Sequence, residues 1–183
     1  MKKLIKRKSV SVIAMSGYSD NKIRQSIAQS VLSTLLSLRI DKIIPPFLVV
    51  VEEAQNFVPS KIEGSGIQTS TAIIKQIATE GRKFGIGLIL ISQRPSRLDP
   101  TVLSQCNSFI TMKIVNPADQ SYIRSTIETL GKDEISLLPD LGIGEAIISG
   151  QCVNFPILAR ISEPETRGSY EEKDAFIEIK KWS

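Results

Sequence analysis

The sequence predicts an α/β fold, with a mostly parallel sheet flanked by helices and with a C-terminal hairpin and tail helix. Three observations predict this class: short apolar runs of strand length, apolar residues at helical spacing between them, and turn residues at most boundaries. Alternating strands and helices are typical of a doubly wound parallel sheet with right-handed crossovers. With 183 residues, 42% of them hydrophobic, the chain is long enough for the core of one such domain.

Apolar patterning places the elements in order. Alternating or continuous apolar residues predict strands at residues 9–14, 47–51, 86–91 and 109–114. Helical spacing and cap residues predict helices at residues 21–39, 71–83, within 98–106, and 118–129. A stretch rich in Gly, Ser and Lys over residues 58–70 predicts an exposed loop.

The C-terminal part follows a different pattern. Residues 145–149 and 153–161 flank a Gly-Gln turn and predict a hairpin, before a charged terminal helix over residues 170–182. We therefore expect one domain over residues 1–168 and a tail helix over residues 169–183.

The composition narrows the chemistry that the chain can perform. Histidine is absent, which removes histidine-based acid or base catalysis and argues against a zinc or iron site. The net charge of +4 permits contact with nucleic acid without requiring it. Cys106 and Cys152 are far apart in sequence, so we expect no disulfide framework and a reduced, cytoplasmic setting. We also expect a soluble protein, because no apolar stretch approaches the length of a membrane span.

An apolar run that ends in two carboxylates is the most informative feature of the chain. Phe47 to Val51 are followed at once by Glu52 and Glu53. Ligands in open α/β sheets bind at the carboxyl ends of the strands. The pair resembles a Walker B strand of nucleotide triphosphatases, in which one acid holds Mg²⁺ through water and the next polarises the attacking water. The alternative is a pair of solvated acids that supply charge to a helix N-terminus.

A basic turn follows the second predicted helix. Arg82 and Lys83 lie at its C-terminal end, just before Gly85 and the next strand. Cations favour the C-terminus of a helix, and glycine favours the left-handed cap position. A plain helix cap therefore explains this turn when it is considered alone.

A polar strand end is the third informative stretch. The strand over residues 86–91 leads to Gln93 and Arg94, at the edge that would face a γ-phosphate. A glutamine amide there can contact both a phosphate oxygen and water. The alternative is an ordinary polar loop that ends a strand. The order and spacing of the three stretches together favour a phosphate-hydrolysing machine.

The glycine-rich phosphate loop that usually accompanies a Walker B strand is absent from the sequence. No segment matches G-x-x-x-x-G-K-[ST], whose backbone amides and lysine cradle the β- and γ-phosphates. Gly64 and Gly66 have no lysine after them, and Gly131-Lys132 is followed by Asp133. The sequence therefore supplies only part of a phosphate site.

Residues 47–97 resemble the C-terminal half of the motor domain of the archaeal HerA hexameric DNA translocases. The likeness rests on Val-Val-Glu-Glu-Ala-Gln-Asn-Phe, Glu-Gly-Arg-Lys-Phe-Gly and Leu-Ile-Ser-Gln-Arg-Pro-Ser-Arg-Leu-Asp-Pro. It extends to residues 9–38 and 103–146, and is weakest in the first eight residues and after Gly168. It implies an incomplete RecA-like (P-loop NTPase) domain and an ATP-dependent translocase or helicase of double-stranded DNA in end processing and repair.

The resemblance also implies roles for particular residues. Glu52 would help to hold Mg²⁺ through water, Glu53 would be the catalytic base, and Gln93 would sense the γ-phosphate. Arg82 matches an arginine finger that reaches into a neighbouring subunit's site, and Arg94 is a weaker match for the same role. Gln93 and Arg94 would both contact the nucleotide. The implied cofactors are ATP and Mg²⁺. The implied partners are double-stranded DNA, further copies in a hexameric ring, and a NurA-like nuclease, with no membrane.

The sequence also departs from that family. The N-terminal β-barrel and the Walker A strand of HerA-like proteins do not appear in it, so we expect a fragment or a truncated gene. Without the phosphate loop we expect little or no ATP hydrolysis from this chain alone. We also expect exposed strand edges and apolar surface, so that solubility depends on self-association or a partner. Lys61, in the expected loop, is a candidate DNA contact.

Three other functions fit parts of the pattern. One is a DNA-pumping ATPase of the FtsK or conjugation type. Another is a truncated, non-catalytic module that binds intact HerA-like subunits. A third is a small Mg²⁺-dependent nuclease that uses Glu52 and Glu53, which is disfavoured because adjacent residues of a strand point to opposite faces.

Overall fold

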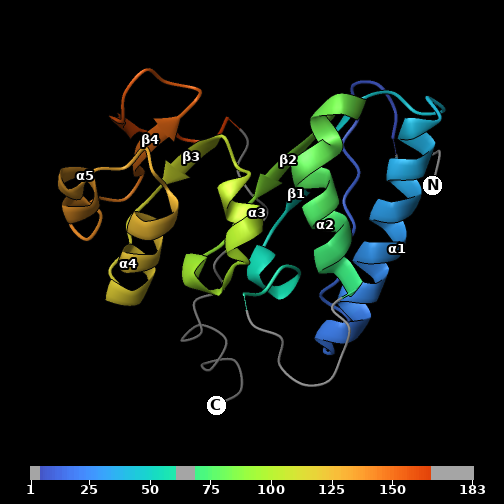
Figure 1. The fold of residues 1–183 in the computed structure, drawn as a ribbon, viewed down its shortest axis with the longest axis horizontal. Coiled ribbons are helices and arrows are strands. Elements are labelled where there is room, and N and C mark those ends of the chain that lie inside the picture. The colour runs from blue at the N-terminus through green and yellow to red at the C-terminus, as the bar shows by residue number, and fades with distance from the viewer. Residues whose placement is uncertain (1–4, 61–68, 166–183) are drawn as a thin grey trace, which may run out of the picture.

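The computed structural model describes residues 5–60 and 69–165, which form helices, strands and three short 3₁₀ turns (Figure 1). The helices are α1 (Asn21–Ile40), α2 (Thr69–Glu80), α3 (Pro100–Ser104), α4 (Pro117–Thr126) and α5 (Lys132–Leu137). The strands are β1 (Phe47–Val51), β2 (Ile86–Leu90), β3 (Ser108–Thr111), β4 (Glu145–Gly150) and β5 (Ile157–Arg160). The 3₁₀ turns are η1 (Ala54–Asn56), η2 (Gly81–Phe84) and η3 (Pro95–Arg97).

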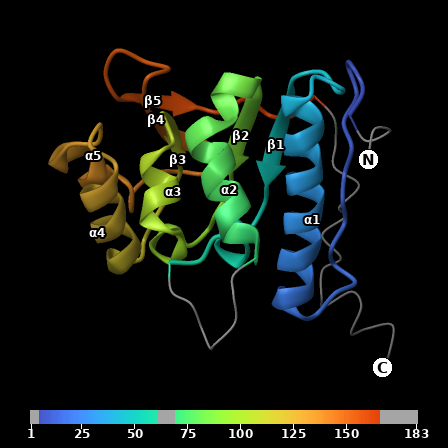
Figure 2. The same ribbon diagram turned by 45° about the vertical axis from the view of Figure 1, so that its right-hand side comes forward.

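The strands β1 and β2 form a parallel pair, as the sequence predicts. Their register runs from Phe47 opposite Ile86 to Val51 opposite Leu90. In Figure 2 the helices α1, α2 and α3 lie in front of the strands. The α/β class, with parallel strands flanked by helices, is therefore confirmed.

Alternation along the two strands decides which residues enter the first core. Phe47 and Val49 of β1, with Leu88 and Leu90 of β2, pack against buried side chains of α1 and α2. The buried members of this core are Leu32, Leu36, Val58, Ile73, Ile74, Ile77, Ile86 and Val102. Because side chains alternate between the faces of a strand, the intervening residues point away from this core.

The crossover from α2 to β2 is closed by a glycine. Gly85 has a φ of +72°, in the left-handed region that glycine adopts readily, and its N–H donates to the carbonyl of Arg82 at 3.1 Å. A Cβ at this position would also lie 3.2 Å from the ring of Pro46. The turn therefore joins the helix directly to the first residue of the strand.

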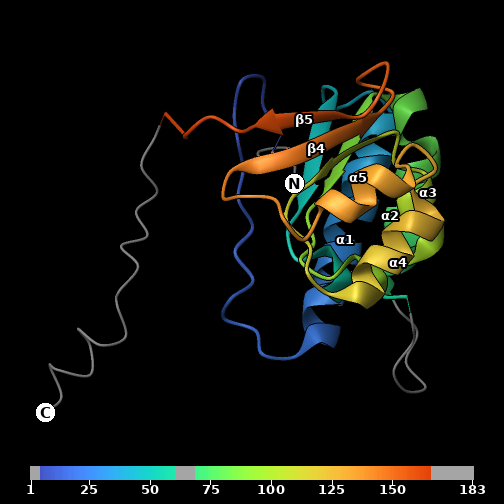
Figure 3. The ribbon, with the colours of Figure 1, turned by 90° about the vertical axis from the view of Figure 1, so that its left-hand side faces the viewer.

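The strands β3, β4 and β5 form a separate antiparallel sheet, in the order β3-β4-β5. Figure 3 shows β4 and β5 side by side. The hairpin predicted at the C-terminal side is confirmed. The expectation that residues 109–114 extend the parallel sheet is wrong, because β3 pairs antiparallel with β4. Gly150 makes this pairing possible, because a Cβ there would collide with the backbone of Asn107 and Ser108.

A second core joins α4 and α5 to this sheet. Its buried members are Ile123, Ile127, Leu130, Ile135, Leu138, Leu141 and Ile147. The predicted helix over residues 118–129 ends at Thr126, and α5 follows as a separate helix that the sequence pattern did not indicate.

The predicted strand over residues 9–14 is not formed. Val10 and Val12 are 91% and 85% exposed, so this segment buries little of the apolar surface that would hold a strand in a sheet. No strand of the described part pairs with it. Most of the expected loop over residues 58–70, including Lys61, lies outside the described residues, as does the tail helix expected over residues 169–183.

Within residues 5–60 and 69–165, no helix has the length and apolar character needed to cross a membrane.

One face of the parallel pair carries exposed apolar side chains. Leu48 and Val50 are 57% and 53% exposed, and Ile89 and Ile91 are 44% and 47% exposed. We call these four residues the exposed sheet face. Val50 and Ile89 lie opposite one another in the register. Contiguous apolar surface of this kind favours association with another surface.

We expect Val50→Thr combined with Ile89→Thr to reduce concentration-dependent self-association, measured by sedimentation velocity. The free energy of unfolding should change by less than about 0.5 kcal/mol, because both side chains are largely exposed. The matched control Val49→Thr, on the opposite face of β1, should cost about 1–2 kcal/mol because it places a hydroxyl in the core. Association that is unchanged in the double variant would contradict this role of the exposed sheet face.

Candidate functional site

The candidate site lies at the carboxyl ends of β1 and β2. Glu52 and Glu53 follow the last residue of β1, and Ser92 and Gln93 follow β2 after one intervening residue. Because the two strands are parallel and in register, their carboxyl ends meet at the same edge of the sheet. Chain segments nearly forty residues apart therefore converge there.

Glu53 has an unusual backbone conformation. Its φ and ψ are 49° and 46°, in the left-handed region that residues other than glycine, asparagine and aspartate seldom occupy. The next residue is pinned, because the Ala54 N–H donates to the carbonyl of Ile91 at 2.9 Å and Ala54 is fully buried. This turn directs the Glu53 side chain back toward the end of β2.

Both carboxylate oxygens of Glu53 accept hydrogen bonds from glutamine side chains. Gln93 Nε2 donates to Oε1 at 2.8 Å, and Gln55 Nε2 donates to Oε2 at 2.5 Å. The structure thus brings together Glu53 and Gln93, two of the residues that the sequence pattern singled out. One amide comes from the end of β2 and the other from η1, so the carboxylate bridges the two chain segments.

Two further polar residues of this site were missed by the sequence analysis. Ser92 Oγ donates to Gln55 Oε1 at 2.6 Å and accepts from the Arg94 N–H at 3.1 Å. The available signal was position: Gln55 lies two residues after Glu53, and Ser92 directly precedes Gln93. Local spacing alone did not show that the two side chains meet.

Glu52 is exposed, and among residues 5–60 and 69–165 no hydrogen bond or ion pair holds its carboxylate. The described residues contain no group of three acidic, cysteine or histidine side chains that could hold a metal. A single free carboxylate fits Mg²⁺ only as one partner, because this ion keeps several water ligands and takes phosphate oxygens as others. Glu52 therefore supplies at most one ligand to such an ion.

Arg82 lies near the amino end of β2, at the opposite end of the parallel pair from the candidate site. It belongs to η2, which precedes the first residue of β2, whereas Glu53 and Gln93 follow the carboxyl ends. A five-residue strand spans roughly 16 Å at about 3.3 Å per residue. The fold of one chain thus keeps the exposed Arg82 away from Glu53. Arg94 is also exposed, but it lies next to Gln93 at the start of η3.

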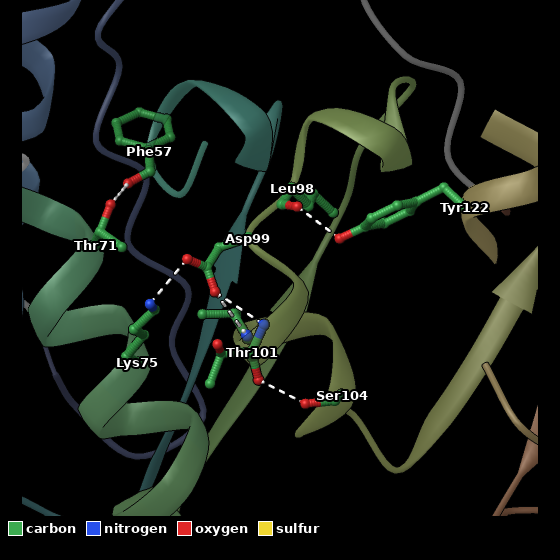
Figure 4. Close-up of polar contacts among 9 residues, drawn as sticks. Phe57, Thr71, Lys75, Leu98, Asp99, Thr101, Ser104 and Tyr122 are labelled. Atoms are coloured by element: carbon green, nitrogen blue, oxygen red, sulfur yellow. Dashed lines mark hydrogen bonds and ion pairs between the residues drawn. The ribbon is translucent and has the colours of Figure 1, made fainter. Parts of the chain in front are cut away.

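The segment that follows Gln93 is anchored to α4. Asp119 is 2% exposed, and its carboxylate accepts from the Ser96 N–H at 3.0 Å. Tyr122 donates its hydroxyl hydrogen to the carbonyl of Leu98 at 2.7 Å (Figure 4). These contacts fix η3 against a helix from the C-terminal half of the chain.

A second group of contacts anchors the same segment to α2 (Figure 4). Lys75 Nζ lies 2.8 Å from Asp99 Oδ2, and Asp99 Oδ1 accepts from the backbone N–H groups of Thr101 and Val102 at the start of α3. Thr71 donates to the carbonyl of Phe57 at 3.3 Å, which ties α2 to the end of η1. The loops after β1 and β2 are thus held by one shared scaffold.

The environment of Asp99 changes its acidity. Desolvation on its own would raise the pKa of this carboxyl, but the hydrogen bond and charge of Lys75 and the N–H groups of Val102 and Thr101 outweigh it. The pKa of Asp99 is therefore lowered from its usual value of 3.8. A group with a depressed folded-state pKa stabilises the fold above its unfolded-state pKa and loses that effect as the pH falls through the folded value.

We expect Asp99→Ala to lower the free energy of unfolding at neutral pH by about 1–2 kcal/mol, measured by urea denaturation. About 1 kcal/mol comes from the lost helix cap, and the partly exposed ion pair adds less than that. The difference from the unchanged protein should shrink as the pH falls below 3.8 and Asp99 becomes protonated. The control Asp99→Asn keeps the helix cap, so its free energy of unfolding should lie between those of the unchanged protein and of Asp99→Ala. A difference that does not depend on pH would contradict the role of the carboxylate charge.

Comparisons with known proteins place this geometry in a family context. No protein-family model matches the chain. The chain is 42% identical over 160 residues to a probable DNA double-strand break repair helicase HerA of Methanocaldococcus jannaschii, covering 87% of this chain and 30% of that protein. It is 35% identical over 186 residues to the DNA double-strand break repair helicase HerA of Sulfolobus acidocaldarius, covering 97% of this chain and 36% of that protein. The chain thus spans about a third of the length of these relatives.

Two solved structures share the fold. The genome-packaging NTPase B204 of Sulfolobus turreted icosahedral virus 2, solved with ATP-gammaS, matches with a TM-score of 0.62 at 17% identity, over 88% of this chain and 71% of that one. VirB4 of Thermoanaerobacter pseudethanolicus matches with a TM-score of 0.63 at 19% identity, over 81% of this chain and 40% of that one. At such identities the likeness concerns the fold. Together with the sequence relatives, it identifies the chain as a HerA-like protein whose α/β fold is similar to that of B204 and VirB4.

Proposed function

We propose that the chain is the C-terminal part of a HerA-like, ATP-dependent translocase or helicase of double-stranded DNA that acts in DNA end processing and repair. The observation that carries this proposal is the contact between Glu53 and Gln93, which places an acid and an amide at the carboxyl edge of a parallel pair. The sequence relatives are DNA double-strand break repair helicases, which supports the same class.

In this proposal each polar group at the edge has a separate task. Glu53 accepts a proton from the water that attacks the γ-phosphate and orients that water. Gln93 donates its amide hydrogens to a γ-phosphate oxygen, and the neighbouring Arg94 adds positive charge to the nucleotide site. Glu52 holds Mg²⁺ through water. The ion would neutralise charge on the phosphate oxygens of ATP.

Arg82 acts on a neighbouring subunit in this proposal. Its place at the opposite edge of β2 supports a role in trans, because it cannot reach the Glu53 of its own chain without unfolding the strand. Head-to-tail assembly of copies brings opposite edges of adjacent subunits together and closes into a ring, here a hexamer around DNA. A NurA-like nuclease is the proposed partner of that ring in end processing.

The lack of a phosphate loop in the sequence limits the activity of this chain alone. Backbone amides and the loop lysine supply most of the grip on the β- and γ-phosphates, and two carboxylates without them repel a triphosphate. We therefore propose that this chain hydrolyses little or no ATP until a phosphate-binding segment completes the site.

A second candidate function is a non-catalytic module that binds intact HerA-like subunits. The exposed sheet face favours it, because four apolar side chains there lack cover in the described structure. Altered subunit exchange after mixing this chain with intact HerA-like rings would support the module, and unchanged exchange would count against it.

The first test is phosphate release from Mg-ATP by the purified chain, with and without double-stranded DNA, compared with Glu53→Gln. We expect no release above the variant, because the phosphate grip is incomplete. Once the site is complete, the same substitution should slow turnover by about 10²–10⁴-fold, as loss of a general base does. Release that survives Glu53→Gln would overturn the assignment of the base.

A second test examines Arg82 in mixed rings with an intact HerA-like protein that hydrolyses ATP. We expect Arg82→Ala chains to depress turnover at substoichiometric doses, because each variant removes transition-state charge stabilisation from its neighbour's site. The matched control is Lys83→Ala, which removes an exposed cation of the same turn and should leave turnover unchanged. Equal effects of the two substitutions would point to a general loss of charge and contradict the finger.

A further inference from the structure

We infer that Gln55 is a positioning residue that holds the Glu53 carboxylate in place, and that Ser92 in turn fixes Gln55. This inference rests on the proposed function, since it concerns the acid assigned there as the base. It adds two residues, one from η1 and one from the end of β2, to the machinery of the site. Neither of them would need to touch the nucleotide.

The geometry of the amide of Gln55 carries the inference. Its nitrogen donates to Glu53 Oε2 at 2.5 Å, and its oxygen accepts from Ser92 Oγ at 2.6 Å. Both ends of the amide are therefore engaged, which fixes its orientation as well as its position. The Ser92 hydroxyl is fixed as well, because its oxygen accepts from the Arg94 N–H at 3.1 Å.

A structural role alone does not explain this arrangement well. The turn after β1 is already closed by backbone bonds, from Ala54 N–H to the carbonyl of Ile91 and from Asn56 N–H to the carbonyl of Glu53. Gln55 is half-buried and its amide contacts side chains. The two hydrogen bonds of the Gln55 amide are therefore not needed to close the turn. They orient the carboxylate of Glu53.

The two glutamine amides that donate to Glu53 have different roles when a nucleotide binds. Gln93 must turn its amide toward the γ-phosphate, and Glu53 Oε1 then becomes available to a water molecule. Gln55 has no such task, because its oxygen is held by Ser92. It keeps Oε2 bonded and prevents the carboxylate from swinging out to solvent.

The first test uses the nucleotide-free chain and the side-chain amide signals of its glutamines in ¹H–¹⁵N NMR spectra. Glu53→Ala should move the signals of both Gln55 and Gln93 toward those of a solvated amide, with the exposed Gln105 as an internal reference. Ser92→Ala should move only the Gln55 signal, and Ser92→Thr, which keeps the hydroxyl, should restore it. A Gln55 signal that does not respond to Glu53→Ala or to Ser92→Ala overturns the inference.

The second test measures turnover in a HerA-like assembly that contains this chain and hydrolyses ATP. Gln55→Ala should lower kcat by about 10–100-fold with KM unchanged, because a misplaced base slows the chemical step without weakening ATP binding. Gln105→Ala is the matched control and should leave both constants unchanged. If Glu53→Gln abolishes turnover but Gln55→Ala leaves kcat unchanged, the positioning role of Gln55 is wrong while the proposed function still stands. Turnover that survives Glu53→Gln defeats the proposed function itself.

Discussion

The parallel pairing of β1 with β2 is the constraint on which the candidate site depends. Their register aligns the two carboxyl ends, so that Glu53 and Gln93, forty residues apart in sequence, come within one hydrogen bond. The crossover through α2 and Gly85 makes this pairing possible, and the first core holds α1 and α2 against the strands. A change in register would move every side chain of the site to another level or face.

Polar contacts then hold the loops at this end of the sheet in place. Asp99 joins α2 to the start of α3, and the buried Asp119 grips the Ser96 N–H from α4. The segment between Gln93 and Asp99 is therefore held from two sides, by elements that belong to the two different cores. Such buried or partly buried anchors matter most for loops, because loop backbone lacks the regular ladder that satisfies a strand.

The sequence predicted correctly those elements that are defined by their local pattern of apolar residues. Helix α1, with apolar residues at helical spacing, and the continuous apolar strands β1 and β2 were placed within a residue or two. The strand predicted over residues 9–14 was wrong because an alternating segment forms a strand only when a neighbouring strand provides hydrogen-bond partners. No strand of the described part pairs with it. The antiparallel direction of β3 depends on the close approach at Gly150, and the Gln55–Ser92 bond depends on a contact 37 residues apart. Neither can be derived from local spacing.

The left-handed turn at Glu53 has a consequence for how this position can change. A left-handed residue with a side chain costs about 1–2 kcal/mol relative to an ordinary conformation. Glycine would relieve that cost, because it adopts the left-handed conformation readily. It would also delete the carboxylate. The backbone conformation therefore favours glycine at this position, whereas the hydrogen bonds from Gln55 and Gln93 favour an acid, and a library sorted for resistance to heat would show which effect is larger.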